Sequence, residues 1–185
     1  MRTDRLVLRA WRTDDAEAAL GIYGHADVAR WLSPAMDRVP DLPAMRLLLQ
    51  QWIAEDARFA EPGGRWAVER AADHEVIGGA VLLPLPPGNE DWEIGWQLHP
   101  DEWGQDYAGE CTFALASWAF AHGLDEVFTV VRPDNTRTAA AVRRNGMHWV
   151  GETRKYFDLD LQVFRLRAAD LDRTAHEGHR PPNYT

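Results

Sequence analysis

Residues 92–110 bring together the parts of a site for an anionic ligand. An alternating strand ends at Pro100, a short loop carries Gly104, and a helix begins directly afterwards. The first backbone N–H groups of a helix have no partner within the helix and carry partial positive charge. Such a helix start can hold a diphosphate group. The same pattern also occurs at an ordinary strand–loop–helix junction, so the residues alone leave both interpretations open.

Other residue types that often do chemistry are placed less favourably. The run His176-Glu177-Gly178-His179 has the wrong spacing for a zinc-binding H-E-x-x-H helix and lies near the chain end. We therefore expect no metal site. Cys111, the one cysteine, excludes a disulfide framework, and its place inside a predicted helix is typical of a small core residue.

The elements that must position the anion site are those of a mixed α/β chain. Hydrophobic periodicity and helix-terminal residues define them. The predicted strands are residues 5–9, 65–70, 76–83, 92–98, 127–131, 149–153 and 156–167, and the predicted helices are residues 13–23, 27–32, one opened by Pro43, 105–122 and 135–144. A largely antiparallel front half is thus followed by crossover helices. We expect a single domain over residues 1–172 and a mobile tail over residues 173–185.

Composition and charge narrow the class of function. A chain of 185 residues can bury a core without disulfides. Its 20 Lys and Arg residues against 29 Asp and Glu residues give a formal charge of -9, which argues against nucleic acids and anionic membranes as partners. Neither a signal peptide nor an apolar run of the ~18 residues needed to span a membrane is evident. We expect a cytoplasmic protein, monomeric or homodimeric.

Four segments then occur in a characteristic order: Thr3–Arg9 followed by Asp14-Asp15-Ala16, Glu93–Leu98, His99–Ala108, and Asn135–Thr138 followed by Val142, Arg144, Gly146 and Met147. Together they resemble the GNAT superfamily of N-acetyltransferases and, within it, the ribosomal-protein N-terminal acetyltransferases of the RimJ/RimL type. The similarity covers about residues 3–168. It implies an α/β (α+β) fold with a central mixed, mostly antiparallel, twisted sheet. About seven strands are flanked by helices, and the fourth and fifth strands splay apart.

The resemblance implies transfer of an acetyl group from acetyl-coenzyme A (acetyl-CoA) to a primary amine, without a metal. The pantetheine arm would lie in the splay and bond the backbone of Trp96, Gln97 and Leu98. The remaining coenzyme-binding residues would be Trp103, Gly104, Gln105, Asp106, Tyr107, Ala108 and Gly109 at the pyrophosphate, with Asn135, Thr138 and Arg144 on the second coenzyme motif.

Two positions depart from the family pattern. Asp106 replaces the second glycine of the loop, and two like charges ~5 Å apart at an effective dielectric of about 20 repel by about 3 kcal/mol. Alternatively, Asp106 favours the helix N-terminus and fills the anion site itself. Val142 stands where many members have a tyrosine that protonates the leaving thiolate. In the branch that this chain resembles, the serine of the N-x-x-S motif is the proposed acid, and Thr138 keeps that hydroxyl. The alternative is that the Thr138 hydroxyl bonds back to the carbonyl of Asp134.

A proton acceptor near the acyl carbon would help, because an amine attacks a thioester only when neutral. Glu93 is the first candidate, since it flanks the expected acetyl site and its side chain points away from the face of Trp92 and Ile94. A solvated carboxylate or a structural ion pair is the alternative for Glu93. The weaker candidates are His99, Glu102 and Asp158.

Trp31 and Trp52 fall in the helical region that forms the acceptor cleft in this family, and they would bind substrate unless they pack in the core. The acceptor itself stays open between a protein or peptide amine and a small molecule, namely a polyamine, an aminoglycoside-type antibiotic or an amino acid. The acidic composition leans towards cationic acceptors. Three functions therefore compete. They are an active N-acetyltransferase, a GNAT-fold pseudoenzyme or binding module in which Asp106 has weakened or abolished coenzyme binding, and a transferase for another acyl chain.

Overall fold

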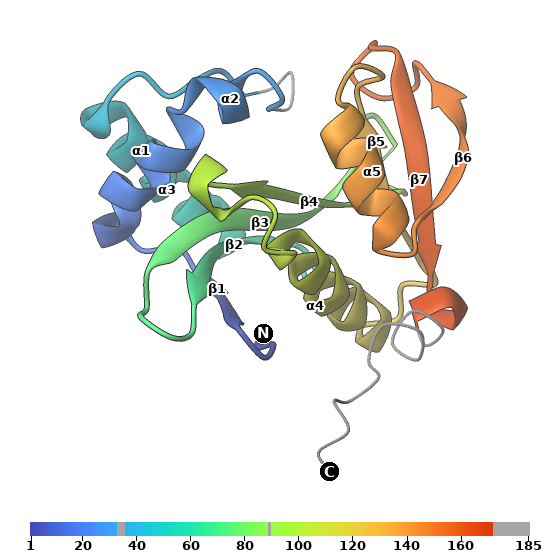
Figure 1. Cartoon of the computed structure of the whole chain (residues 1–185), viewed down its shortest axis with the longest axis horizontal. Helices are drawn as coiled ribbons and strands as arrows, with labels where there is room; N and C mark the ends of the chain where they lie inside the picture. Colours follow the sequence, from blue (N-terminus) through green and yellow to red (C-terminus); the bar gives the residue numbers. More distant parts are fainter. Residues whose placement is uncertain (33–35, 89, 172–185) are drawn as a thin grey trace.

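A computed structural model of the protein describes residues 1–32, 36–88 and 90–171. Its strands form one seven-stranded sheet in the order β1-β2-β3-β4-β5-β7-β6 (Figure 1). The strands are β1 (Leu6–Ala10), β2 (Gly64–Arg70), β3 (Val76–Pro84), β4 (Trp92–Leu98), β5 (Glu126–Val131), β6 (His148–Thr153) and β7 (Leu161–Arg167). The helices are η1 (Thr13–Asp15), α1 (Ala16–Tyr23), α2 (Ala26–Ala29), α3 (Leu42–Asp56), η2 (Pro100–Glu102), α4 (Tyr107–Ala121) and α5 (Thr136–Arg144).

The sheet confirms the expected mixed, mostly antiparallel arrangement. Strands β4 and β5 are parallel and pair at one position, where Glu93 lies opposite Phe128. The other neighbouring strands are antiparallel. At the fork the Thr129 hydroxyl donates a 2.8 Å hydrogen bond to the Ile94 carbonyl. Beyond this point β4 and β5 diverge, which confirms the splay.

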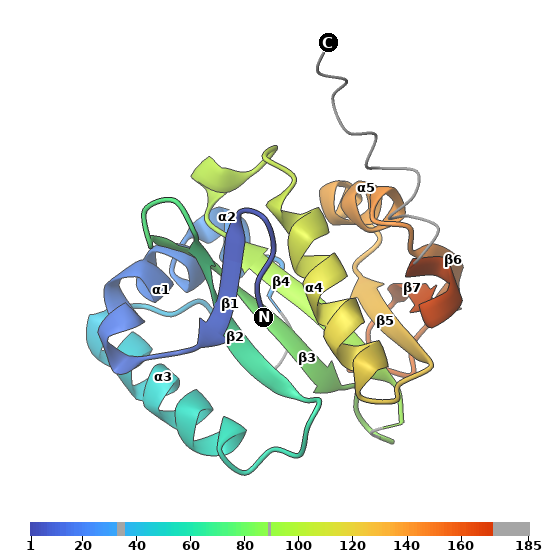
Figure 2. The same ribbon diagram turned by 90° about the horizontal axis from the view of Figure 1, so that it is seen from below.

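Helices cover the two faces of the sheet unequally (Figures 1 and 2). Helices α1 and α3 lie on one face of β1–β4, where Tyr23 and Trp52 pack in a cluster with Ala67. Helix α4 crosses the opposite face, where Leu115 packs in the main core with Ile94. Helix α5 packs on the α4 side. The α1–α3 face of β4 therefore carries Glu93 and Gln97, because side chains alternate along a strand.

Local signals account for where the principal helices begin. The Asp41 carboxylate accepts a 2.9 Å hydrogen bond from the Ala44 N–H and caps α3, with Pro43 in the first turn. The Asn135 side chain accepts a 3.2 Å bond from the Thr138 N–H at the start of α5. Helix α4 begins after Asp106, whose φ of 62° is in the left-handed region that favours glycine.

Several predicted boundaries were wrong. The helix predicted at residues 13–23 begins as the 3-10 turn η1, and the one predicted at 27–32 is only the four-residue α2. The last strand begins at Leu161 rather than residue 156, because a loop with left-handed Phe157 (φ 56°) and Asp158 (φ 53°) comes first. A strand cannot continue through that backbone geometry. The tail at residues 173–185 lies outside the described residues.

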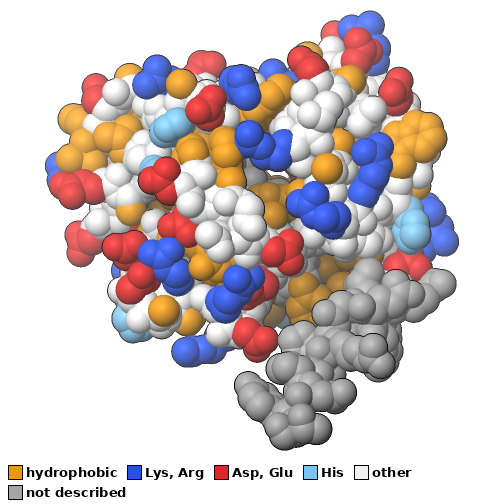
Figure 3. Space-filling model, in the orientation of Figure 1, with side chains coloured by type: hydrophobic (Ala, Val, Ile, Leu, Met, Phe, Trp, Pro, Cys, Tyr) orange, Lys and Arg blue, Asp and Glu red, His pale blue; other side chains and the backbone are white. Residues whose placement is uncertain are grey.

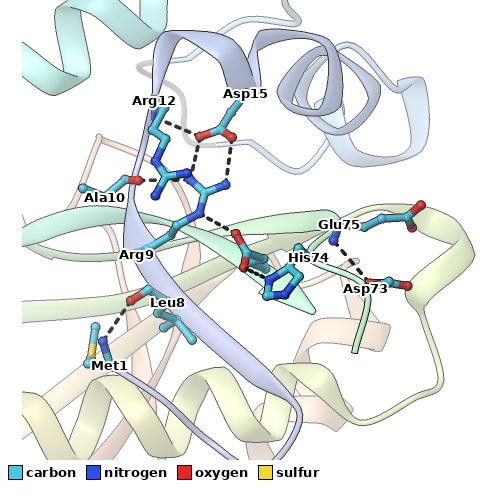
Figure 4. Close-up of polar contacts among 10 residues, drawn as sticks. Met1, Leu8, Arg9, Ala10, Arg12, Asp15, Asp73, His74 and Glu75 are labelled. Atoms are coloured by element: carbon cyan, nitrogen blue, oxygen red, sulfur yellow. Dashed lines mark hydrogen bonds and ion pairs between the residues drawn. The ribbon is translucent and has the colours of Figure 1, made fainter. Parts of the chain in front are cut away.

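A charged cluster ties the N-terminal strand to its neighbours. The Arg9 guanidinium donates two 2.8 Å hydrogen bonds to Asp15 (Figure 4) and a 2.6 Å bond to Glu69 of β2. Glu69 also contacts Nδ1 of His74 at 2.9 Å. These partners raise the pKa of Arg9 and lower the pKa of Glu69. The cluster therefore holds β1, η1 and β2 together at the sheet edge that is remote from the splay.

Candidate functional site

A cavity of about 1280 Å³ opens where β4 and β5 diverge. Residues 95–98 of β4 and 129–131 of β5 line its two sides. It extends from the start of α4 and the inner side of α5 to residues of α1, α2 and α3. Figure 3 shows the hollow between the two halves of the molecule, with basic side chains gathered on the α5 side. The cavity thus connects the loop predicted to bind the pyrophosphate (residues 103–109, the anion loop) with the predicted acceptor residues Trp31 and Trp52.

The anion loop presents five consecutive free backbone N–H groups. Among the described residues, the amides from Gly104 to Ala108 have no hydrogen-bond acceptor. The Trp103 amide instead donates to the Pro100 carbonyl at 3.1 Å, and the Gly109 amide donates to the Asp106 carbonyl at 3.0 Å. Within the expected range from Trp103 to Gly109, the free amides are therefore those of the five inner residues. Free amides at the start of a 15-residue helix suit a diphosphate.

The Asp106 carboxylate is folded over Gly109 instead of capping the helix. Both of its oxygens lie 3.1 Å from the place where a Cβ on Gly109 would be, and the carboxylate accepts no hydrogen bond from the first helical amides. Asn145 Oδ1 approaches the same place at 3.2 Å. The missing side chain of Gly109 thus gives the carboxylate room. The free amides argue against the alternative that Asp106 fills the anion site itself.

Three arginines line the cavity from the side of the splay that β5 and α5 form, namely Arg132, Arg137 and Arg144. None forms a salt bridge with a carboxylate in the part of the chain that the structure describes. The Arg137 guanidinium lies 3.8 Å from the ring centroid of Trp103, so it spans the gap between α5 and the anion loop. Arg132 and Arg137 were missed by the sequence analysis, because the absence of a carboxylate partner is not visible in a sequence.

The other predicted coenzyme residues divide by position. Trp96, Gln97 and Leu98 line the cavity, and the Leu98 carbonyl accepts a 3.1 Å hydrogen bond from the Trp103 indole. Gln105 and Gly109 do not line it. The remaining members of the predicted set that line the cavity are Trp103, Gly104, Asp106, Tyr107, Ala108, Asn135, Thr138 and Arg144.

Glu93 lies at the fork of the splay and lines the cavity. Desolvation there raises the pKa of its carboxyl to about 7, although a hydrogen bond from the Val130 N–H opposes part of that rise. Its carboxylate has no salt-bridge partner among the described residues. A carboxyl with a pKa near neutrality can accept a proton at physiological pH and release it again.

The weaker base candidates are placed less well. Glu102 lines the cavity but accepts a 2.8 Å hydrogen bond from Arg70. The Asp158 side chain is 92% exposed and does not line the cavity. His99 also lies outside the lining, and its Nδ1 accepts a 3.3 Å bond from the Asp101 N–H.

Thr138 projects into the same cavity from α5. Its hydroxyl has no hydrogen-bond partner within residues 1–32, 36–88 and 90–171, so the alternative bond to the Asp134 carbonyl is not formed. Val142, one turn further along, is fully buried in the core. Thr138 is therefore the hydroxyl that α5 offers to the cavity.

The predicted acceptor residues also reach the cavity. Trp31 and Trp52 both line it, beside Tyr23. The Tyr23 hydroxyl donates a 3.4 Å hydrogen bond to Gln97 Oε1, and burial raises the pKa of this phenol. Trp52 packs against Tyr23 with ring centroids 5.2 Å apart. Core packing and a place in the cavity wall are thus compatible for Trp52.

Cys111 is fully buried in α4, and burial raises the pKa of its thiol. That agrees with the expected core role. Among the described residues, no group of three or more His, Cys, Asp or Glu side chains is arranged to hold a metal ion. The described helices also include none long and apolar enough to cross a membrane.

Comparison with known proteins gives consistent matches. Residues 5–148 match the family model described as the acetyltransferase (GNAT) domain. The chain is 28% identical over 158 residues to the uncharacterised N-acetyltransferase YoaA of Bacillus subtilis, which covers 84% of this chain and 86% of that protein. An acetyltransferase structure from Agrobacterium tumefaciens is 26% identical, with a TM-score of 0.71 and coverage of 90% and 93% of the two chains. Mycobacterium smegmatis RimJ in complex with CoA-disulfide is 19% identical, with a TM-score of 0.76 and coverage of 94% and 89%.

Proposed function

The chain belongs to the GNAT acetyltransferase family, and we propose that it transfers an acetyl group from acetyl-CoA to a primary amine by direct attack on the thioester. One observation carries the proposal. Four of the five residues with free backbone amides line one continuous cavity together with Glu93, whose carboxyl has a pKa of about 7. The amides suit an anionic donor, and the carboxyl suits proton transfer from an attacking amine.

The residues at one end of the cavity fit acetyl-CoA. The amides of Gly104–Ala108 would hold the pyrophosphate, and Arg137 and Arg144 would offset its charge. The backbone of Trp96–Leu98 would pair with the pantetheine arm as an added strand. Acetyl-CoA supplies an activated acetyl group, whose C–S bond breaks as the new C–N bond forms.

Two side chains would handle the protons. Glu93 would take the proton that the amine nitrogen loses, directly or through a water molecule. The Thr138 hydroxyl, which has no partner among the described residues, would donate a hydrogen bond to the departing sulfur. We therefore assign to the Thr138 hydroxyl the role that a tyrosine has in many family members. Val142 stands at the position of that tyrosine, and its side chain has no hydrogen-bond donor.

A pseudoenzyme is not supported. That alternative depended on Asp106 blocking the anion loop, whereas its carboxylate lies over Gly109 and the loop amides stay free. The family match and the named N-acetyltransferase relatives also favour an active transferase.

Calorimetric titration of acetyl-CoA into the native chain, followed by a thiol-release assay with a panel of primary amines, tests the proposal. We expect micromolar binding and amine-dependent release of CoA. Thr138→Val should lower kcat by about tenfold to a hundredfold while leaving the affinity for acetyl-CoA nearly unchanged. Thr136→Val, at an exposed position of the same helix outside the cavity, is the matched control. A native chain that fails to bind acetyl-CoA would overturn the proposal.

A further inference from the structure

The sheet face that carries Glu93 continues from β4 across two more strands. The register places Gly95, Val81 and Arg65 in one row across β4, β3 and β2. All three line the cavity. Gly95 has no side chain and Val81 a small one, so little fills the floor of the cavity between Glu93 and Arg65. Two strand spacings of ~4.8 Å separate the backbones of Gly95 and Arg65 by about 10 Å.

Arg65 at the far end of this row is already paired twice. Its guanidinium lies 2.7 Å from an Asp56 oxygen and 3.0 Å from a Glu55 oxygen. One positive charge against two negative charges leaves the cluster with a net negative charge. Glu55 lines the cavity itself, as does Asp27 of α2. A carboxylate on the acceptor would meet an arginine whose charge is already neutralised, whereas a cation would be attracted.

Aromatic rings add to this preference. Trp31 and Trp52 both line the cavity, and the Arg30 guanidinium lies 4.9 Å from the ring centroid of Trp31. The Arg65 guanidinium already lies 5.9 Å from the ring centroid of Trp52, so this wall accommodates a cation. Arg137 and Arg144 of α5 lie on the other side of the splay, whereas Arg132, which follows β5, donates 3.4 Å hydrogen bonds to the carbonyls of Arg30 and Leu32. Asp27, Glu55 and Asp56 still outnumber Arg65 and Arg132 at the acceptor end. The two ends of the cavity therefore carry opposite net charge, and would separate a cationic acceptor from an anionic donor.

We infer that the acceptor is a dication, a primary amine with a second positively charged group about 12 Å from the reacting nitrogen, because Glu93 lies two residues (~7 Å) along β4 from Gly95. The inference rests on the proposed N-acetyltransferase function, because Glu93 marks the point of transfer. The reacting amine would lie at Glu93, and the second cation would lie between Glu55, Asp27 and the tryptophan rings.

Three acceptors of equal chain length test the inference. With acetyl-CoA saturating, kcat/KM is measured for α,ω-diaminooctane, octylamine and ω-aminooctanoic acid, which differ only in the group at the far end. We expect the diamine to exceed octylamine by about tenfold or more, the effect of one favourable charge contact, and the amino acid to be the poorest. Equal values for the diamine and octylamine, or preference for the amino acid, would overturn the inference while leaving the proposed function intact.

A pair of variants locates the second cation. Glu55→Gln should lower the ratio of diamine to octylamine several-fold, mainly through KM. Glu61→Gln removes the same charge from an exposed side chain that does not line the cavity, and should leave the ratio unchanged. An unchanged ratio in Glu55→Gln would count against the assignment.

Binding of the same three compounds gives a readout that does not need turnover. Calorimetric titration into the protein saturated with CoA should show tighter binding of the diamine, and that advantage should shrink in Glu55→Gln. If the compounds bind equally, the inference fails. If the protein binds no acetyl-CoA and acetylates no amine, the proposed function fails instead.

Discussion

Charged side chains behave differently in two regions of the molecule. At the β1–β2 edge, Arg9 lies between Asp15 and Glu69, and every contact is between 2.6 and 2.8 Å (Figure 4). Around the cavity, the half-buried Glu93 and the exposed Arg137 and Arg144 have no salt-bridge partner in the described part of the chain.

This comparison distinguishes two kinds of charged side chain. Those paired within the protein stabilise the fold, and those without a partner beside the cavity are free to contact a ligand. Partly buried charges are normally compensated within the protein, because leaving one without a partner is costly. A charge that is left uncompensated beside a cavity is therefore a candidate for ligand binding or catalysis. The following predictions, from the largest effect to the smallest, test whether the two kinds of charge separate stability from activity.

Glu93→Gln should give the largest change, a loss of about 10²–10⁴ in kcat/KM, because the amide cannot accept the proton. The folded state raises the pKa of this carboxyl from 4.5 to about 7. Ionisation of Glu93 therefore lowers stability progressively between these pH values and costs about 3 kcal/mol above them. The variant should accordingly be more stable than the native chain at pH 8, as measured by urea denaturation. Glu152→Gln, at an exposed position of β6, should change neither activity nor stability.

The native enzyme should lose activity on the acid side of pH 7. Since Glu93 acts as a base only when ionised, kcat/KM should rise with pH up to about its pKa of 7 and then level off. A profile measured with acetyl-CoA saturating and the amine below its KM should show this limb. Deprotonation of the acceptor amine near its own, higher pKa will also increase kcat/KM. An acceptor of known pKa is therefore needed to separate the two effects. An unchanged acid limb in the residual activity of Glu93→Gln would exclude Glu93 as its source.

Arg9→Met should lower the free energy of unfolding by about 3 kcal/mol, because Asp15 and Glu69 would keep their charges but lose the guanidinium that compensates them. The affinity of the folded protein for acetyl-CoA should not change. Urea denaturation and calorimetry measure the two quantities separately. Arg46→Met, at an exposed position of α3, is the control for loss of an arginine. A weaker affinity of Arg9→Met for acetyl-CoA would contradict the proposal that this charge affects stability and not coenzyme binding.

Arg144→Gln should have the opposite pattern, weaker binding of acetyl-CoA with unchanged stability. We expect the Kd for acetyl-CoA to rise about tenfold, the effect of one charge-assisted contact, with little change in Tm. The neighbouring Arg143→Gln provides a matched comparison, since that side chain lies over the Phe164 ring and does not line the cavity. Equal effects of the two variants on Kd would mean that α5 acts only through its overall charge.

The smallest effect concerns the carboxylate in the anion loop. Gly109→Ala would place a Cβ 3.1 Å from both Asp106 oxygens and should displace that carboxylate. We expect acetyl-CoA to bind a few-fold more weakly, because moving a like charge towards the pyrophosphate adds repulsion. In an Asp106→Gly background the same Gly109→Ala substitution should have no such effect. An equal loss in both backgrounds, measured by calorimetry, would contradict the steric role of Gly109.

Local sequence determined much of this protein. The alternation along Trp92–Leu98 predicts the strand that the structure contains, and it places Glu93 on the face opposite Ile94. The proline, the glycine and the helix that follow predict the anion loop. These features depend on neighbours in the chain, so a short window of sequence contains the information. The boundaries that were wrong, such as the start of β7, depend on the left-handed backbone at Phe157 and Asp158, which the sequence does not show.

Only the tertiary structure decided which charges are paired. Arg9 and Glu69 lie 60 positions apart in the chain, and their bond depends on the β1–β2 register. The same holds for Arg137, which meets Trp103 only because α5 packs beside the splay. Whether Asp106 blocks its loop likewise depends on the space over Gly109. Charge and residue type are local properties, whereas compensation depends on distance in three dimensions, and for that reason the function of each charge became visible only in the fold.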